Sequence, residues 1–151
     1  MTLIESINAD LKKALLDGKK EDATILRGLK SALQNEVINL QKQATGLSEQ
    51  ESISVLKKEA KKRQESADLY LKVGEQERCN KELYEKQLIS IYLPEEMSQE
   101  ELEAKIDEIV HRDSLEITQQ NMGQMIGKIK KELGNQADGG AIANAIKRRI
   151  A

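Results

Sequence analysis

Apolar residues recur every three to four positions along the chain, in seven segments separated by glycine, proline or short polar stretches. Such spacing places the apolar side chains of a segment on one face of an α-helix. With one proline and 9 glycines, the sequence has few of the turn residues that a strand-rich fold needs. We therefore expect an all-α protein whose helices cover residues 3–17, 21–43, 48–73, 75–93, 98–112, 120–133 and 138–150.

Helix-starting and helix-ending residues divide this pattern into two groups. In Ser48–Glu51 and in Ser98–Glu101 a serine is followed three residues later by glutamate, which is the capping box that begins a helix. Between these two boxes, Pro94 lacks an amide hydrogen and disfavours helix in the residue before it. We place a domain boundary there. We expect a helical N-terminal domain with four helices in residues 1–93 and a small three-helix domain in residues 94–151.

The same spacing predicts which side chains pack inward. In the fourth helix, Tyr84, Leu88 and Ile91 share one face, and we expect that face to point into the core. In the sixth helix, Gly123 and Gly127 are four residues apart and lie on one side, so we expect them to let another helix approach closely. This packing interpretation replaces a phosphate-binding loop, because that motif needs a different glycine spacing and a Ser or Thr after the lysine.

The third helix carries many charges opposite its apolar stripe. Its lysines invite an RNA-binding interpretation, but acids stand four residues away from several of the bases, where helical neighbours pair. We therefore favour a salt-bridged surface made of the pairs Glu59–Arg63, Lys61–Glu65 and Asp68–Lys72.

The composition indicates which residue types form the core and in which cellular compartment the protein is expected. Phe and Trp are absent, so the core must consist of Leu, Ile, Ala and Met. Cys79 is the single cysteine and cannot form an internal disulfide, which fits a reducing compartment. No apolar run approaches the roughly 20 residues of a membrane span, and the first residues do not resemble a signal peptide. We expect a cytoplasmic protein with no membrane association.

Catalytic and metal-binding patterns are scarce. The thiol of Cys79 and the imidazole of His111 lie in different predicted domains, so we interpret them as a surface thiol and a helix-terminal histidine. One cysteine and one histidine do not make a zinc site, and the acids of residues 95–108 lack the loop spacing of a calcium site. We expect no catalytic residue, no cofactor and no metal ligand.

Charge is distributed unevenly although the net charge of the chain is only −2. Residues 95–116 carry nine acids and two bases, a local −7, whereas residues 117–151 carry six bases and two acids, a local +4. Because residues 93–151 contain no aromatic side chain that could stack on bases, contacts with RNA would involve phosphate and sugar. The candidate RNA-binding residues are Lys128, Lys130, Lys131, Gln136, Lys147, Arg148 and Arg149.

Five short motifs occur in order along the chain and, together, resemble the YqeY-like family over nearly the full length. They are Arg27-Gly28-Leu29-Lys30-Ser31-Ala32 with Asn35, Lys58-Glu59-Ala60-Lys61-Lys62-Arg63 with Glu65-Ser66, Tyr92-Leu93-Pro94, Met122-Gly123-Gln124-Met125-Ile126-Gly127, and Ala137-Asp138-Gly139. Two positions depart from the family pattern. Lys131 stands where the family often has proline, and Asn135-Gln136 stands where it often has Gly-Arg, so Gln136 replaces a phosphate-binding arginine.

The resemblance implies a helical N-terminal domain joined to a C-terminal domain similar to the tail of the amidotransferase B subunit. That enzyme acts on glutamyl-tRNA(Gln) and aspartyl-tRNA(Asn), and its tail holds tRNA away from the reacting centre. The family label is a carbon–nitrogen ligase with glutamine as amido donor. This chain contains no amidase-type Ser/Lys centre and no nucleotide-binding domain.

Three functional hypotheses therefore remain open. The first is a non-catalytic accessory protein, related to the tRNA-dependent amidotransferase, that binds tRNA or another structured RNA through its basic C-terminal helices. The second is a helical module that docks a protein partner through its charged helices. The third is the carbon–nitrogen ligase activity of the family label.

Overall fold

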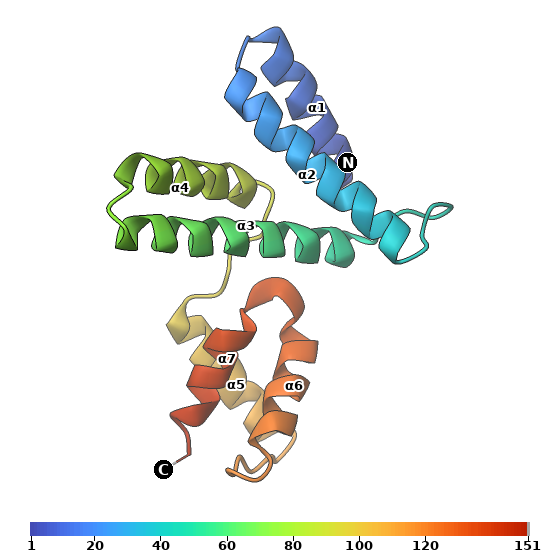
Figure 1. Ribbon diagram of the computed structural model, residues 1–151. Helices are drawn as coiled ribbons and strands as arrows, with labels where there is room; N and C mark the ends of the chain where they lie inside the picture. The colour runs from blue at the N-terminus through green and yellow to red at the C-terminus, as the bar shows by residue number, and fades with distance from the viewer. Residues whose placement is uncertain (151) are drawn as a thin grey trace. The chain divides into compact units, whose positions relative to one another are not determined.

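A computed structural model describes residues 1–150 of the chain. Within these residues it contains seven α-helices, one short 3-10 helix and no strand, as the hydrophobic spacing predicts (Figure 1). The all-α prediction is confirmed. The chain divides into two compact units, one formed by Met1–Leu93 and the other beginning at Pro94. The two units are described separately.

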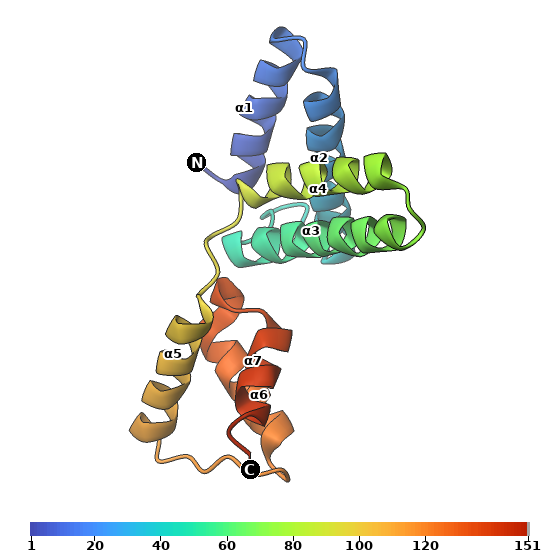
Figure 2. The same ribbon diagram turned by 90° about the vertical axis from the view of Figure 1, so that its left-hand side faces the viewer.

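The first unit consists of two antiparallel helical hairpins. Helices α1 (Leu3–Leu16) and α2 (Lys20–Asn39) form one hairpin, and helices α3 (Glu49–Lys72) and α4 (Gln76–Ser90) form the other. Both views show the partners of each hairpin side by side (Figures 1 and 2). The apolar face of each helix is buried where the hairpins meet. The buried core there comprises Ile7, Ala14, Ala23, Leu26, Leu29, Leu33, Val55, Leu56, Ala60 and Ile89.

Two tyrosines of the C-terminal part of this unit bond to the α1–α2 hairpin. The hydroxyl of Tyr84 donates to Asp22 and that of Tyr92 donates to Asp10, each at 2.5 Å. Tyr84 is 43% exposed, so the prediction that it points into the core is wrong. Its phenol lies at the surface because its hydroxyl reaches a carboxylate there. Ile91 is also exposed, at 70%, so the prediction that it points into the core is wrong as well.

The far part of the α3–α4 hairpin has a much smaller core. Beyond Ala60 on α3 and before Ile89 on α4, the buried side chains of the described structure are Ala67 and Cys79. The prediction of a surface thiol is therefore wrong, since Cys79 is only 4% exposed. Small side chains fit where two antiparallel helices lie close together along their length, and this contact could not be seen in the pattern of α4 alone.

The ends of the helices follow local capping chemistry. Both predicted capping boxes form, with Ser48 accepting from the amide of Glu51 at 3.1 Å and Ser98 accepting from that of Glu101 at 3.2 Å. Helix α2 ends at Asn39, four residues before the predicted end, because Gln41 adopts a left-handed conformation with φ 55°. The amide of Lys42 then donates back to the carbonyl of Val37 and closes the end of the helix.

The charged surface of α3 differs from the expected ladder of ion pairs. Arg63 pairs with Glu59 as predicted, with the two groups 2.8 Å apart, and also with Glu85 of α4 at 3.2 Å. The predicted pairs Lys61–Glu65 and Asp68–Lys72 do not form within residues 1–150. The carboxylate of Asp68 instead accepts from Gln64 at 2.9 Å.

The second unit is a three-helix arrangement of α5 (Gln99–Arg112), α6 (Met122–Leu133) and α7 (Gly139–Lys147). The 3-10 helix η1 (Gly134–Gln136) connects α6 to α7, and Gly134 permits the turn because its φ is +60°. Helix α6 begins two residues later than predicted, since Thr118 and Asn121 bond to each other's amides in the preceding turn. The core comprises Leu102, Ile106, Ile109, Ile129, Leu133, Ala137, Ile142, Ala145 and Ile146.

No helix among residues 1–150 is both long enough and apolar enough to cross a lipid bilayer.

Candidate nucleic-acid interface

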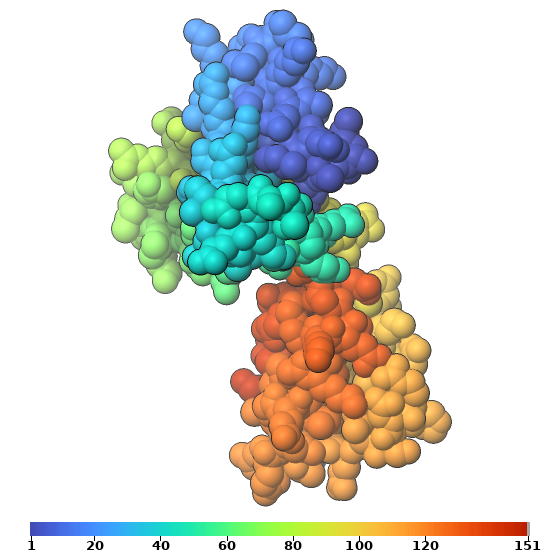
Figure 3. Space-filling model, turned by 90° about the vertical axis from the view of Figure 1, so that its right-hand side faces the viewer, coloured from blue at the N-terminus to red at the C-terminus, as the bar shows by residue number. Residues whose placement is uncertain are grey.

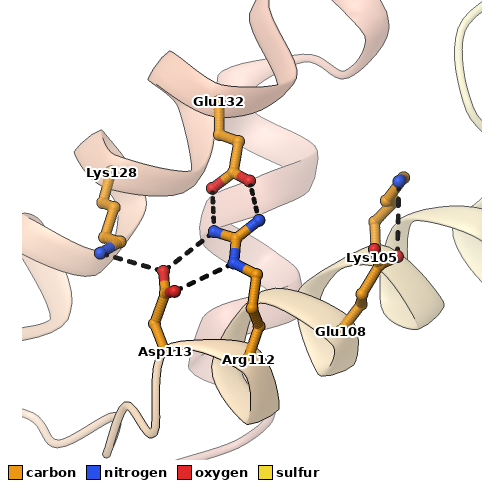
Figure 4. A network of polar contacts seen from close by, with 6 residues as sticks. All are labelled: Lys105, Glu108, Arg112, Asp113, Lys128 and Glu132. Atoms are coloured by element: carbon orange, nitrogen blue, oxygen red, sulfur yellow. Dashed lines mark hydrogen bonds and ion pairs between the residues drawn. The ribbon is translucent and has the colours of Figure 1, made fainter.

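An arginine at the end of α5 joins this helix to α6. Two nitrogens of the Arg112 guanidinium donate to the carboxylate of Glu132 at 2.6 and 3.0 Å. Two donate to the neighbouring Asp113, both at 2.9 Å (Figure 4). These bonds lower the pKa of Asp113 and that of Glu132 below their ordinary values. Glu132, one of the two acids within the basic stretch, is thus held by a base of the acidic helix.

Lys128 belongs to the same network. Its ammonium lies 3.3 Å from Asp113, and its side chain is 42% exposed (Figure 4). After Arg112, the hydrogen bond from Lys128 is the next cause that lowers the pKa of Asp113. Lys128 therefore shares its carboxylate with an arginine and remains accessible from solvent.

Lys130 closes the end of α6 and does not face a ligand. Its ammonium donates to the carbonyl oxygens of Gly134 at 2.9 Å and Ala137 at 2.8 Å. Carbonyls at a helix C-terminus lack intrahelical donors and attract a cation there. The partial burial of Lys130 and these two bonds indicate a structural role, and RNA contact by this residue stays a prediction.

The two arginines after α7 pair with the acidic helix. Arg148 lies 3.2 Å from Glu103, and Arg149 lies 2.7 Å from the same carboxylate. Arg149 also pairs with Asp107 and donates to the backbone carbonyl of Glu103 at 3.1 Å. A large part of the predicted basic surface is therefore neutralised by residues of α5.

The remaining positive charge lies mainly on the outer face of α6, which we define as Gly123, Gln124, Gly127, Lys128 and Lys131. Figure 3 shows α6, in orange, at the surface of the second unit. Lys131 is exposed and has no ion pair within residues 1–150. A Cβ atom built on Gly123 or Gly127 would meet nothing within 4 Å. The expectation that another helix packs on these glycines is therefore wrong for the described part of this chain, and the α6 backbone is open to solvent there.

Two further predicted residues lie outside this face. The side chain of Gln136 is exposed, and its backbone carbonyl accepts from the amide of Met97 at 2.9 Å. Lys147 is exposed in the last turn of α7 and has no ion pair within residues 1–150. Asp138 caps α7, since its carboxylate accepts from the amide of Gly140 at 3.1 Å.

The charge of the whole second unit limits what this surface can do. Residues 94–151 carry 8 bases and 11 acids, a net −3. An anion would therefore be attracted locally, by the α6 face, and not by the unit as a whole. The sequence indicated the acidic and the basic stretch but not their pairing, which depends on contacts between helices about 45 residues apart.

Groups that could perform covalent chemistry are few in the described structure. The Cys79 thiol is buried in the first unit, and His111 is exposed near the end of α5. Residues 1–150 contain no group of three or more His, Cys, Asp or Glu side chains arranged to hold a metal ion.

Comparison with known proteins identifies the family. A family model described as YqeY-like protein matches residues 4–150. No curated protein matches the chain. Because the family model covers nearly all of the sequence, the chain belongs to the YqeY-like family.

Proposed function

We propose that this YqeY-like protein is a non-catalytic accessory protein that binds tRNA or another structured RNA through its second unit. The outer face of α6 would contact the RNA backbone, and Gln136 and Lys147 would make further contacts. The role would be auxiliary to tRNA-dependent amidation, in which other proteins perform the chemistry.

The observation that carries this proposal is the composition of the α6 face. Lys131 forms no ion pair within residues 1–150, and Lys128 shares its partner, Asp113, with Arg112. The two glycines leave the helix backbone uncovered beside these lysines. Each glycine lowers helix stability by roughly 0.5–1 kcal/mol relative to alanine. Close approach of a ligand backbone is a physical reason for glycine at such an open position.

The same face supports recognition of shape over sequence. Lysine ammoniums bind phosphate as point charges and carry no information about bases. The second unit has no aromatic side chain on which an unpaired base could stack. A folded RNA, whose phosphates are held in a fixed arrangement, suits such a surface better than a flexible single strand.

Binding of a tRNA pool to the full-length protein tests the proposal. We expect binding at about 50 mM salt that weakens strongly at about 200 mM, because binding releases counterions. The double variant Lys131→Glu, Lys147→Glu should lose most of this affinity. Lys105→Glu is the matched control, since it reverses a charge on α5, where Lys105 pairs only with Glu108 at 3.4 Å. Absence of tRNA binding by the wild type at low salt would exclude the proposed function.

A second variant tests whether the paired arginines are held back from RNA. Glu103→Gln removes the carboxylate that Arg148 and Arg149 share. We expect this variant to bind tRNA more tightly than the wild type. Unchanged or weaker binding would show that Arg148 and Arg149 stabilise the fold without binding RNA. The contact with tRNA would then be confined to α6, η1 and Lys147.

A further inference from the structure

The first unit contains a polar groove between α2 and α3 that the proposed function does not use. Its volume is about 470 Å³. Its lining comes from the second half of α2 and the first half of α3, and Figure 1 shows that these two helices cross there. Its lining residues are Ala32, Asn35, Glu36 and Asn39 from α2, and Val55, Lys58, Glu59 and Lys62 from α3.

The lysines at and beside this groove are largely free of strong ion pairs. The main acid among them, Glu59, is bound to Arg63 at 2.8 Å, and Arg63 is bound again to Glu85. Lys62 reaches Glu59 only at 3.3 Å and is 66% exposed. Lys58 and Lys61 are exposed and have no ion pair within residues 1–150.

This arrangement produces a local excess of positive charge. Residues 57–63 carry five bases and one acid, a net +4, within a unit whose net charge is only +1, from 16 bases and 15 acids in residues 1–93. Lys58 and Lys62 stand one helical turn apart on the same side of α3, and Lys61 stands next to them. Asn35 and Asn39 stand one turn apart on the facing helix.

We propose that this groove is a second phosphate-binding surface, which takes the sugar–phosphate backbone of a nucleic acid. Lys58 and Lys62, which line the groove, would neutralise phosphates there, and Lys61, which is next to Lys62 on α3 but outside the lining, would contact a neighbouring phosphate. The amides of Asn35 and Asn39 would donate to phosphate or sugar oxygens on the other side of the groove. The inference shares its ligand class with the proposed function, but it depends on different residues in a different unit.

The floor of the groove favours nucleic acid over a protein or a lipid surface. Its apolar lining consists of Ala32 and Val55, which offer little apolar surface against which an aromatic or large apolar anchor of a protein partner could pack. No large apolar side chain lines the groove for insertion into lipid. Of its two carboxylates, Glu59 is paired with Arg63, and the rest of the polar lining, apart from Glu36, consists of lysine ammoniums and neutral amides, which can bind a phosphodiester backbone.

The carboxylate of Glu36 would repel a phosphate in the groove, so removing its charge provides a test in which binding should become stronger. It lines the groove, and no ion pair or side-chain hydrogen bond neutralises it within residues 1–150. An anion in the groove would therefore be repelled by its carboxylate. Removing this charge should strengthen binding if the ligand lies in the groove, and should have no effect if it does not.

The experiment measures binding of full-length protein to tRNA over a series of salt concentrations. The triple variant Lys58→Glu, Lys61→Glu, Lys62→Glu should bind at least tenfold more weakly. The slope of log affinity against log salt should fall by about two to three, because each lost phosphate contact contributes about 0.7–0.9. The matched control is Lys12→Glu, Lys19→Glu, Lys20→Glu, which changes three exposed lysines of the same unit and should keep most of the affinity and slope. Glu36→Gln should bind more tightly than wild type.

The outcomes separate this inference from the proposed function. If the triple variant binds like the control while Lys131→Glu, Lys147→Glu loses binding, the groove is not a binding surface and the proposed function stands. If the triple variant loses binding while the α6 variant keeps it, the groove is the RNA site and the α6 site fails. Competition by polyglutamate as strong as that by RNA would overturn the choice of nucleic acid. If the triple variant loses helicity, two single variants test the groove instead. Lys61→Ala should weaken tRNA binding and Glu36→Gln should strengthen it, and unchanged binding by both would overturn the inference.

Discussion

Arg112 and Glu132 form a two-point contact between the last turn of α5 and the last turn of α6. Two nitrogens of the guanidinium donate to the two carboxylate oxygens at 2.6 and 3.0 Å. The same guanidinium holds Asp113, which in turn accepts Lys128. One arginine thereby links the ends of the two helices and, through Asp113, also a lysine on the proposed RNA-binding face.

The stability that this contact gives the second unit should be lost when Arg112 is replaced and should also depend on pH. Arg112→Ala should lower the melting temperature of the second unit. The bonds from Arg112 depress the pKa of Asp113 and that of Glu132, so their contribution is complete above the ordinary carboxyl values of 3.8 and 4.5 and is lost as the pH falls below them. The wild type and variant should therefore differ most near pH 7 and least near pH 2, as followed by circular dichroism. An equal difference at both pH values would contradict this account.

Lys130 and Lys131 are neighbours with opposite expected roles. Lys130→Met keeps the aliphatic stem but removes both bonds to the carbonyls of Gly134 and Ala137, which should destabilise the second unit by about 1–2 kcal/mol. Lys131→Met should leave stability unchanged, because Lys131 is exposed and forms no ion pair within residues 1–150. Urea denaturation followed by circular dichroism measures both. If the two variants were equally stable, Lys130 would not stabilise the end of α6 as we expect.

The capping box at the start of α3 should be sensitive to acid. Ser48→Ala should lower the free energy of unfolding by about 1 kcal/mol, because the amide of Glu51 loses its acceptor. The bond from Lys42, together with that from the amide of Ser48, lowers the pKa of Glu51 to about 2. The contribution of Glu51 is therefore present above its ordinary value of 4.5 and is lost as the pH falls toward 2. Glu51→Gln should flatten this part of the stability profile, measured by denaturation at several pH values.

The tyrosine–aspartate bonds in the first unit should weaken at alkaline pH. Burial, and then the bond to Asp10, raises the pKa of Tyr92 above its ordinary value of 10.0. Because this pKa is raised on folding, the protonated Tyr92 contributes fully to the stability of the first unit below pH 10. That contribution is lost as the pH rises through the folded-state pKa. Tyr92→Phe should cost about 1 kcal/mol at neutral pH and should remove this alkaline loss. Tyrosinate absorbance during a pH titration reports the shift, and an early ionisation of Tyr92 would contradict it.

The buried position of Cys79 predicts slow reaction with thiol reagents. In the native protein the thiol is 4% exposed, so labelling should require opening of the α3–α4 hairpin. Labelling should become fast in urea concentrations that unfold the first unit. A native rate equal to that of a free thiol would restore the earlier expectation of a surface cysteine.

Local features of this protein could be predicted from sequence, whereas contacts between distant segments could not. The capping boxes at Ser48 and Ser98 form as expected because each involves residues only three positions apart. The partners of Arg149 could not be predicted, since Glu103 and Asp107 reach it only after α7 has packed on α5. Burial of Cys79 likewise depends on the neighbouring α3. The sequence therefore predicted basic residues in the second unit, but it did not show which carboxylates pair with them.

The uneven core of the α3–α4 hairpin implies that its two ends have unequal lifetimes. At the base, large side chains such as Leu56 and Ile89 are fully buried, whereas the far part contains only Ala67 and Cys79 as buried groups. Local opening costs less free energy where less apolar surface is buried. Backbone amides near Gly74 should therefore exchange with deuterium through brief fraying of the tip, while those near Leu56 should wait for the whole unit to unfold.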